Sequence, residues 1–145
     1  MDKIHVAWDE YLGYLDEISQ SIQQYTKVDV IVGLVRGGLI PSVYLSHSLG
    51  VPMITFDPHL LHSNGDPREP IFLPISPSIT KVILILDDIS DTGKTLSKCQ
   101  KFFDNRGFKI FTASVFINQT TTIHESDHYV KDSEKKWVVF PYEEE

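Results

Sequence analysis

The sequence has little of several features that would assign it to whole classes of protein. Its 145 residues include one cysteine, Cys99, so an internal disulfide is impossible and we expect a cytoplasmic protein. No apolar run approaches the roughly 20 residues that cross a bilayer, and no apolar signal segment opens the chain. We therefore expect no membrane partner.

Basic residues are also scarce. Thirteen lysines and arginines stand against twenty acids, for a formal charge of −7, which argues against a broad nucleic-acid-binding surface. We accordingly expect no nucleic-acid partner. Hydrophobic residues make up 41% of the chain and internal repeats are missing, so residues 1–145 should form one globular domain.

The most informative stretch, residues 82–96, runs from an apolar strand into acids and then into a small polar loop. Five aliphatic residues at 82–86 suit a strand buried on both faces of a parallel sheet. Two adjacent carboxylates, Asp87 and Asp88, follow at its carboxyl end, where packing alone would not place them. Residues 91–95, Asp-Thr-Gly-Lys-Thr, then supply backbone N–H groups, hydroxyls and a helix N-terminus, which predicts a phosphate cradle.

A P-loop for a nucleoside triphosphate is a competing interpretation. Its pattern, G-x-x-x-x-G-K-[ST], is matched in its second half by Gly93, Lys94 and Thr95. Its first glycine is replaced by Asp88, whose carboxylate would point at a phosphate rather than wrap it. The acids make better sense if they hold sugar hydroxyls or a hydrated Mg²⁺, which predicts a phosphorylated sugar as the ligand.

Strand and helix patterns alternate along the rest of the chain, which predicts an α/β fold with a central, mainly parallel sheet flanked by helices. An amphipathic helix is expected at 9–24, with Leu12, Leu15, Ile18 and Ile22 on its apolar face. Other helices are expected at 39–49 and 95–105. Strands are expected at 3–6, 28–35, 51–56, 81–88 and 109–117, with a short one at 129–130.

Two further segments suggest binding elements. Val35-Arg36-Gly37-Gly38 lies between a strand and a helix, where glycines let an anion approach the backbone and Arg36 adds positive charge. A plain glycine-rich turn is the alternative. Residues 57–80 hold five of the eight prolines, and so long a connection indicates a lid that would exclude water, or else a solvated hairpin.

Near the C-terminus, residues 137–143 gather three aromatic side chains within six positions. They either cap the core or form a flat wall that stacks on a heterocycle.

The 82–96 stretch resembles the PRPP-binding motif of type I phosphoribosyltransferases, two acids followed by x-x-Asp-Thr-Gly-x-Thr, at every defining position. The resemblance implies the single-domain type I fold, PRPP (5-phosphoribosyl 1-pyrophosphate) as donor, and Mg²⁺ as cofactor. Asp87 and Asp88 would bind the ribose hydroxyls and Mg²⁺, and Asp91 would assist proton movement at the base. The implied 5′-phosphate ligands are Asp91, Thr92, Gly93, Lys94 and Thr95.

The resemblance extends to the other segments. It implies that Val35, Arg36, Gly37 and Gly38 bind pyrophosphate across a strained or cis Val35–Arg36 peptide, with Arg36 stabilising the leaving group. Residues 57–80 would be the flexible hood. The 137–143 segment is similar to the base-recognition segment of xanthine–guanine and archaeal-type purine enzymes, which implies three base contacts. These are stacking by Trp137 and edge recognition by the Val138 backbone and Glu143.

One position departs from the family pattern. Enzymes for 6-oxopurines carry a lysine near the end of the preceding strand, and this sequence has Asn118, a shorter and uncharged donor. The resemblance implies a purine-salvage transferase for hypoxanthine, guanine or xanthine that works as a homo-oligomer, a dimer or tetramer. Asn118 keeps two alternatives open: a catalytically silent PRPP sensor, and a transferase for another base.

Overall fold

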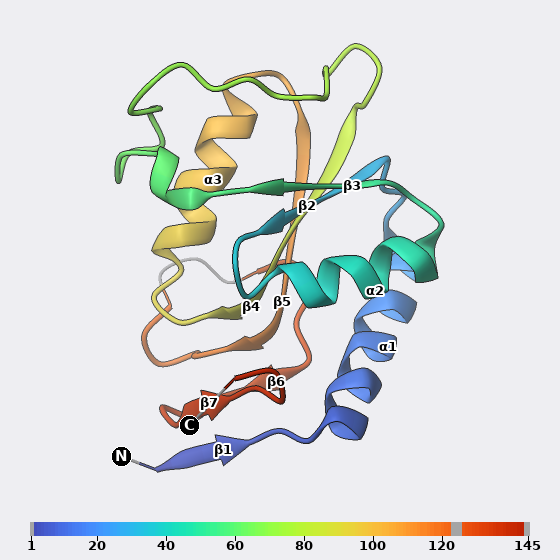
Figure 1. The fold of residues 1–145 in the computed structure, drawn as a ribbon, viewed down its shortest axis with the longest axis vertical. Helices are drawn as coiled ribbons and strands as arrows, with labels where there is room; N and C mark the ends of the chain where they lie inside the picture. Colours follow the sequence, from blue (N-terminus) through green and yellow to red (C-terminus); the bar gives the residue numbers. More distant parts are fainter. Residues whose placement is uncertain (1, 123–125, 144–145) are drawn as a thin grey trace.

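Five parallel strands form the central sheet, in the spatial order β3-β2-β4-β5-β6 (Figure 1). The computed structural model describes residues 2–122 and 126–143. The strands are β2 (Val30–Leu34), β3 (Met53–Phe56), β4 (Val82–Ser90), β5 (Lys109–Ile117) and β6 (Lys131–Asp132). Every pairing between them is parallel, so all five carboxyl ends lie at one edge. This is the α/β architecture that the sequence predicts.

Helices cover both faces of this sheet. One face is packed by α1 (Trp8–Tyr25) and α2 (Leu39–Leu49), and the other by α3 (Lys94–Asp104). Alternate residues of β4 point to opposite faces: Leu84 and Leu86 join the core under α1 and α2, and Ile83 and Ile85 join the core under α3. Double coverage explains why the strand is apolar at consecutive positions.

A separate two-stranded sheet ties the ends of the fold together. β1 (Lys3–His5) pairs in parallel with β7 (Trp137–Val139), in a register that sets Ile4 opposite Val138. Both strands lie at the lower edge of Figure 1, beside the end of β5. The pairing fixes the aromatic C-terminal segment next to the carboxyl edge of the main sheet.

The predicted hood segment, 57–80, begins with a short 3₁₀ helix at Pro58–Leu60 and then runs along α3 to the start of β4 (Figure 1). Ile71, Leu73 and Ile75 are half-buried against the core on that side. Only the beginning of the segment lies near the carboxyl edge of the sheet, and its role as a lid stays a prediction.

Two local expectations were wrong, and two predicted strands begin later than expected. The predicted strand at 129–130 is displaced to β6, because Lys131 and Asp132 are the residues that pair with the end of β5. Leu12 is 44% exposed, since the groove between α1 and α2 is open at its position, whereas the other three apolar residues of that face are buried. The strands expected at 28–35 and 51–56 are confirmed but start only at Val30 and Met53. Asp29, just before the first of them, accepts hydrogen bonds from the N–H groups at the start of β4. Among the described residues, no helix is long and apolar enough to cross a membrane.

Candidate active site

The two predicted anion loops follow neighbouring strands and therefore meet in space. β2 and β4 are hydrogen-bonded in parallel, and each ends at the carboxyl edge of the sheet. Residues 35–38 follow β2, and the loop that begins α3 follows β4. Ligands of parallel α/β sheets bind at this edge, where the loops diverge.

The first loop is shaped by close backbone contacts. The Val35–Arg36 peptide is cis, as the resemblance implied, and the Gly38 N–H donates to the Leu34 carbonyl at 2.8 Å. A β-carbon at Gly38 would overlap the Leu86 carbonyl oxygen of β4, and one at Gly37 would overlap the Asp88 carboxylate. Only glycine fits at either position, and Arg36 is left exposed to a ligand.

The paired acids lie half-buried at the end of β4. The Asp88 N–H donates to Asp87 Oδ1 at 2.8 Å, and the Ile89 N–H donates to Asp88 Oδ1 at 2.7 Å. Burial raises the pKa of both carboxyls, and the charge of Asp88 raises the pKa of Asp87 further. A bound cation would offset this cost of ionisation.

The donor set fits a magnesium ion. Carboxylate oxygens are the hard ligands Mg²⁺ prefers, and it usually takes one or two carboxylates together with waters and substrate phosphates. Asp87 and Asp88 supply that number. Within the described part of the chain, no cluster of three or more metal-ligating side chains forms a complete protein cage.

A small cavity of about 110 Å³ marks the predicted phosphate cradle. It lies at the N-terminus of α3, where Gly93 has a φ of 81°, a left-handed conformation that glycine adopts freely. Lys94 is absent from its lining, and its N–H donates to Thr92 Oγ1 at 3.3 Å. The lining residues are Asp87, Ile89, Ser90, Asp91, Thr92, Gly93, Thr95 and Leu96.

A second cavity, of about 590 Å³, contains the predicted base-binding residues. Trp137 is 59% exposed on its wall, which leaves the indole free to stack on a ligand. Glu143 is partly engaged, because its Oε1 accepts the Phe140 N–H at 2.9 Å. The lining also includes Asp88, Ile89, Asp91, Asn118, Thr121, Ser133, Lys135, Lys136, Val138 and Phe140.

Asn118 lies directly against Asp91, the aspartate predicted to act in catalysis. Its Nδ2 donates to Asp91 Oδ1 at 3.1 Å, and the Thr121 hydroxyl shares its one proton between this oxygen at 3.0 Å and the Asp91 carbonyl at 2.9 Å. The Asn118 amide and the Thr121 hydroxyl together restrict the orientation of the Asp91 carboxylate. They hold it where the base-side cavity meets the phosphate cradle, both of which Asp91 lines.

The third cavity, of about 630 Å³, surrounds Arg36 and shares Asp88 and Glu143 with the base-side cavity. Tyr142 also lines it, and its hydroxyl donates to Asp88 Oδ2 at 3.2 Å. Burial and the Asp88 charge raise the pKa of Tyr142, which keeps the hydroxyl protonated as a donor. The sequence did not predict that Tyr142 donates a hydrogen bond to Asp88. The only local signal was the cluster of aromatics at 137–142.

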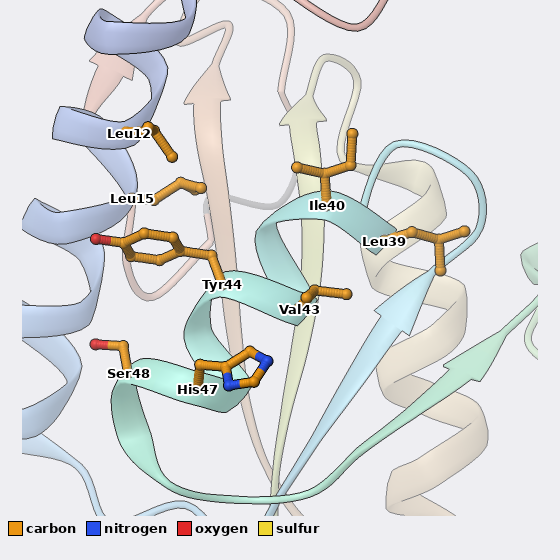
Figure 2. Close-up of a pocket in the computed structure, with 8 residues that line it drawn as sticks. All are labelled: Leu12, Leu15, Leu39, Ile40, Val43, Tyr44, His47 and Ser48. Carbon is orange, nitrogen blue, oxygen red and sulfur yellow. The ribbon is translucent and has the colours of Figure 1, made fainter.

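A larger groove, of about 760 Å³, lies between α1 and α2 and shares Ile40 with the cavity around Arg36. Figure 2 shows Leu12 and Leu15 of α1 facing Tyr44 of α2 across it. Its lining is mostly apolar, and it contains neither the paired acids nor the glycine loops. We do not assign it to the reaction site.

Comparison with known proteins agrees with this geometry. Residues 7–145 match the family model of the phosphoribosyl transferase domain. The purine phosphoribosyltransferase of Pyrococcus horikoshii is 35% identical, with a TM-score of 0.82 over 99% of this chain and 95% of that one.

Two more distant structures share the fold. The Helicobacter pylori xanthine-guanine-hypoxanthine enzyme is 21% identical, with a TM-score of 0.79 over 95% of this chain and 91% of that one. The Trypanosoma cruzi hypoxanthine enzyme, solved with its product IMP, is 17% identical, with a TM-score of 0.70 over 86% of this chain and 76% of that one. The chain belongs to the phosphoribosyltransferase family, a class of glycosyltransferases, and has the purine phosphoribosyltransferase fold.

Proposed function

We propose that this protein transfers the 5-phosphoribosyl group of PRPP to a 6-oxopurine, releasing pyrophosphate and forming a nucleoside 5′-monophosphate. One observation carries the proposal: three cavities adjoin one another at the acids that end and follow β4. The base-side cavity shares Asp88 with the cavity around Arg36, and it shares Asp91 with the phosphate cradle. Their linings suit the three parts of this reaction, which are a 5′-phosphate, a pyrophosphate and a flat heterocycle. The purine relative from Pyrococcus horikoshii supports the same substrate class.

The chain's own residues would act mainly by positioning and electrostatics. Backbone N–H groups and hydroxyls of 91–95 would hold the 5′-phosphate at the N-terminus of α3. Arg36 and the backbone of 35–38 would receive the departing pyrophosphate. Asp87 and Asp88 would orient the ribose hydroxyls and hold Mg²⁺, which when bound neutralises charge on the pyrophosphate.

At the base, Asp91 is the proposed proton acceptor. Asn118 and Thr121 both engage its Oδ1, so the carboxylate can take or share a proton of the purine near N7 without first reorienting. Trp137 would stack on the ring, and the 57–80 segment would limit the access of water to the reacting sugar.

A pyrophosphate-release assay with PRPP and Mg²⁺ tests the proposal against hypoxanthine, guanine, xanthine, adenine and uracil. We expect turnover with at least one of the first three. Turnover with uracil alone, or with adenine alone, would contradict the choice of base. Silence with all five while PRPP still binds would contradict the proposal and favour a PRPP sensor. The homo-oligomeric state and the cytoplasmic location remain predictions.

A further inference from the structure

The base-side cavity needs a donor that Asn118 does not freely provide. A 6-oxopurine presents an exocyclic oxygen, which only accepts hydrogen bonds. Asn118 donates to Asp91, and its own Oδ1 accepts the Thr120 N–H at 3.2 Å and the Thr120 hydroxyl at 2.7 Å. The residue is only 7% exposed, so these bonds hold it in place. Its amide oxygen and one of its two amide N–H groups are thus engaged within the chain, which leaves at most one N–H for a base.

A turn on the facing wall offers a different set of donors. Residues 133–136 connect β6 to β7, and Ser133, Lys135 and Lys136 all line the base-side cavity. Lysine ammonium groups are donors without acceptor capacity. They suit an exocyclic oxygen and disfavour the amino group that adenine carries at the same ring position.

Ser133 has a hydroxyl that lacks a partner. The residue is 1% exposed and, within residues 2–122 and 126–143, its Oγ makes no hydrogen bond. A buried hydroxyl without a partner is costly, and such groups call for an explanation in the site they line. A polar ligand in the cavity would satisfy this one.

The backbone of the turn is firmly anchored and strained. The Ser133 N–H donates to the Ile117 carbonyl at 2.8 Å, directly before Asn118, and the Lys136 N–H closes the turn on the Ser133 carbonyl at 3.0 Å. Glu134 and Lys135 have φ values of 53° and 67°, which residues other than glycine adopt at a cost. Strain of this kind persists where the surrounding structure imposes it, and often at ligand sites.

We propose that the 133–136 turn determines the base preference, with Lys135, Lys136 and the Ser133 hydroxyl donating to the oxygen-bearing edge of a 6-oxopurine. This inference rests on the proposed function and assigns the discrimination to residues that are distinct from Asn118. Asn118 then acts as a positioning residue for Asp91.

The test compares four proteins: the wild type, Ser133→Ala, the double variant Lys135→Met/Lys136→Met, and the control Lys131→Met. Lys131 is an exposed lysine of the nearby β6 strand that does not line the cavity. At saturating PRPP, we expect the double variant to lose at least tenfold in kcat/KM for 6-oxopurines, and Ser133→Ala to lose severalfold. The KM for PRPP should be the same in all four proteins. The Lys131→Met variant should keep the wild-type kcat/KM for every base. If both cavity variants keep the wild-type base profile within twofold, the inference is wrong.

A binding measurement separates this inference from the proposed function. Intrinsic fluorescence of a Trp8→Phe background, in which Trp137 is the remaining tryptophan, reports equilibrium binding of GMP and AMP whether or not the protein turns over. We expect the wild type to prefer GMP and the double variant to lose that preference, with Lys135→Arg/Lys136→Arg retaining it. If no base supports turnover but this pattern appears, the proposed reaction fails and the inference holds. Equal affinity of the wild type for GMP and AMP would overturn the inference.

Discussion

The α-carbon of Gly37 lies so close to the carboxylate of Asp88 that a β-carbon at position 37 would overlap it. The contact joins the proposed pyrophosphate loop after β2 to the acids that end β4. Tyr142 reinforces the junction, because its hydroxyl lies 3.2 Å from Asp88 Oδ2 and 3.5 Å from the Gly37 carbonyl oxygen. The loop after β2, the end of β4 and the C-terminal aromatic segment therefore meet at Asp88.

Gly37→Ala should damage catalysis through this junction. The added methyl must displace either the Asp88 carboxylate or the loop, and misplacement by about 1 Å can cost about 100-fold in rate. We expect such a loss in kcat/KM for PRPP, together with about 1–3 kcal/mol of destabilisation from overpacking. Steady-state kinetics and urea denaturation measure the two effects.

Gly13→Ala is the matched control. Gly13 is exposed within α1, and a β-carbon there would meet nothing within 4 Å. It should leave the kinetics unchanged and stabilise the protein by about 0.5–1 kcal/mol. Full activity in Gly37→Ala would show that catalysis does not depend on the contact between Gly37 and Asp88.

Asp88→Asn should exchange activity for stability. Because burial raises the folded-state pKa of Asp88 above its unfolded value, its contribution to folding is most favourable at low pH and is lost as pH rises through the folded-state pKa. An asparagine does not ionise, so the variant keeps the unfolding free energy that the wild type loses as Asp88 ionises. In metal-free urea denaturation, the unfolding free energy of the variant relative to wild type should therefore increase from pH 4 to pH 8. Turnover should fall by about 100-fold or more.

A fully active Asp88→Asn protein would contradict the assigned role, and a stability difference independent of pH would contradict the buried charge. Glu69→Gln provides an exposed carboxyl for comparison.

His128 should make the protein sensitive to acid. Its Nδ1 lies 3.0 Å from the Ser21 hydroxyl, which ties the segment after β5 to α1. Burial lowers the pKa of His128 below about 6.5, and Asp127 partly opposes the shift. With the folded pKa depressed, the stabilising contribution is complete above the unfolded pKa and is lost as pH falls through the folded value.

His128→Gln should consequently show a flatter dependence of the unfolding free energy between pH 7 and pH 5 than the wild type. His62→Gln, at an exposed position of the 57–80 segment, should follow the wild-type curve. Identical curves for all three proteins would mean that His128 does not titrate differently on folding.

Asn118→Ala should lower kcat more than it changes base selection. Loss of the Nδ2 donor leaves Asp91 held by Thr121 alone, and we expect about a tenfold drop in kcat with the ratio among bases maintained. Gln119→Ala, at the exposed neighbour, should behave like the wild type. A changed base ratio with unaltered kcat would place Asn118 in base recognition after all.

The parts of the fold that sequence patterns could predict are those determined by local chemistry. The aliphatic run of β4 and the glycine after β2 require burial and close approach wherever they occur, and α2 was predicted with its observed bounds. Leu12 could not be placed this way, because spacing on a helix shows which residues share a face and not how far the neighbouring helix extends.

The pairing of β1 with β7 and the position of β6 depend on contacts between distant segments, for which a three-residue strand carries no local signal. The same limit applies to the site. Tyr142 and Ser133 gain their proposed roles from what they lie against, Asp88 and the base-side cavity, and nothing in their own sequence neighbourhoods specifies those partners.

The parallel pairing of β1 with β7 also sets an order of assembly during synthesis. β1 leaves the ribosome first, yet its partner strand is made only after the whole central sheet. The strands and loops proposed to hold PRPP can therefore associate on the nascent chain while β1 is still unpaired. The segment that carries Trp137 is synthesised last. A chain released before that point would keep both anion loops and lack the surface proposed to bind the base.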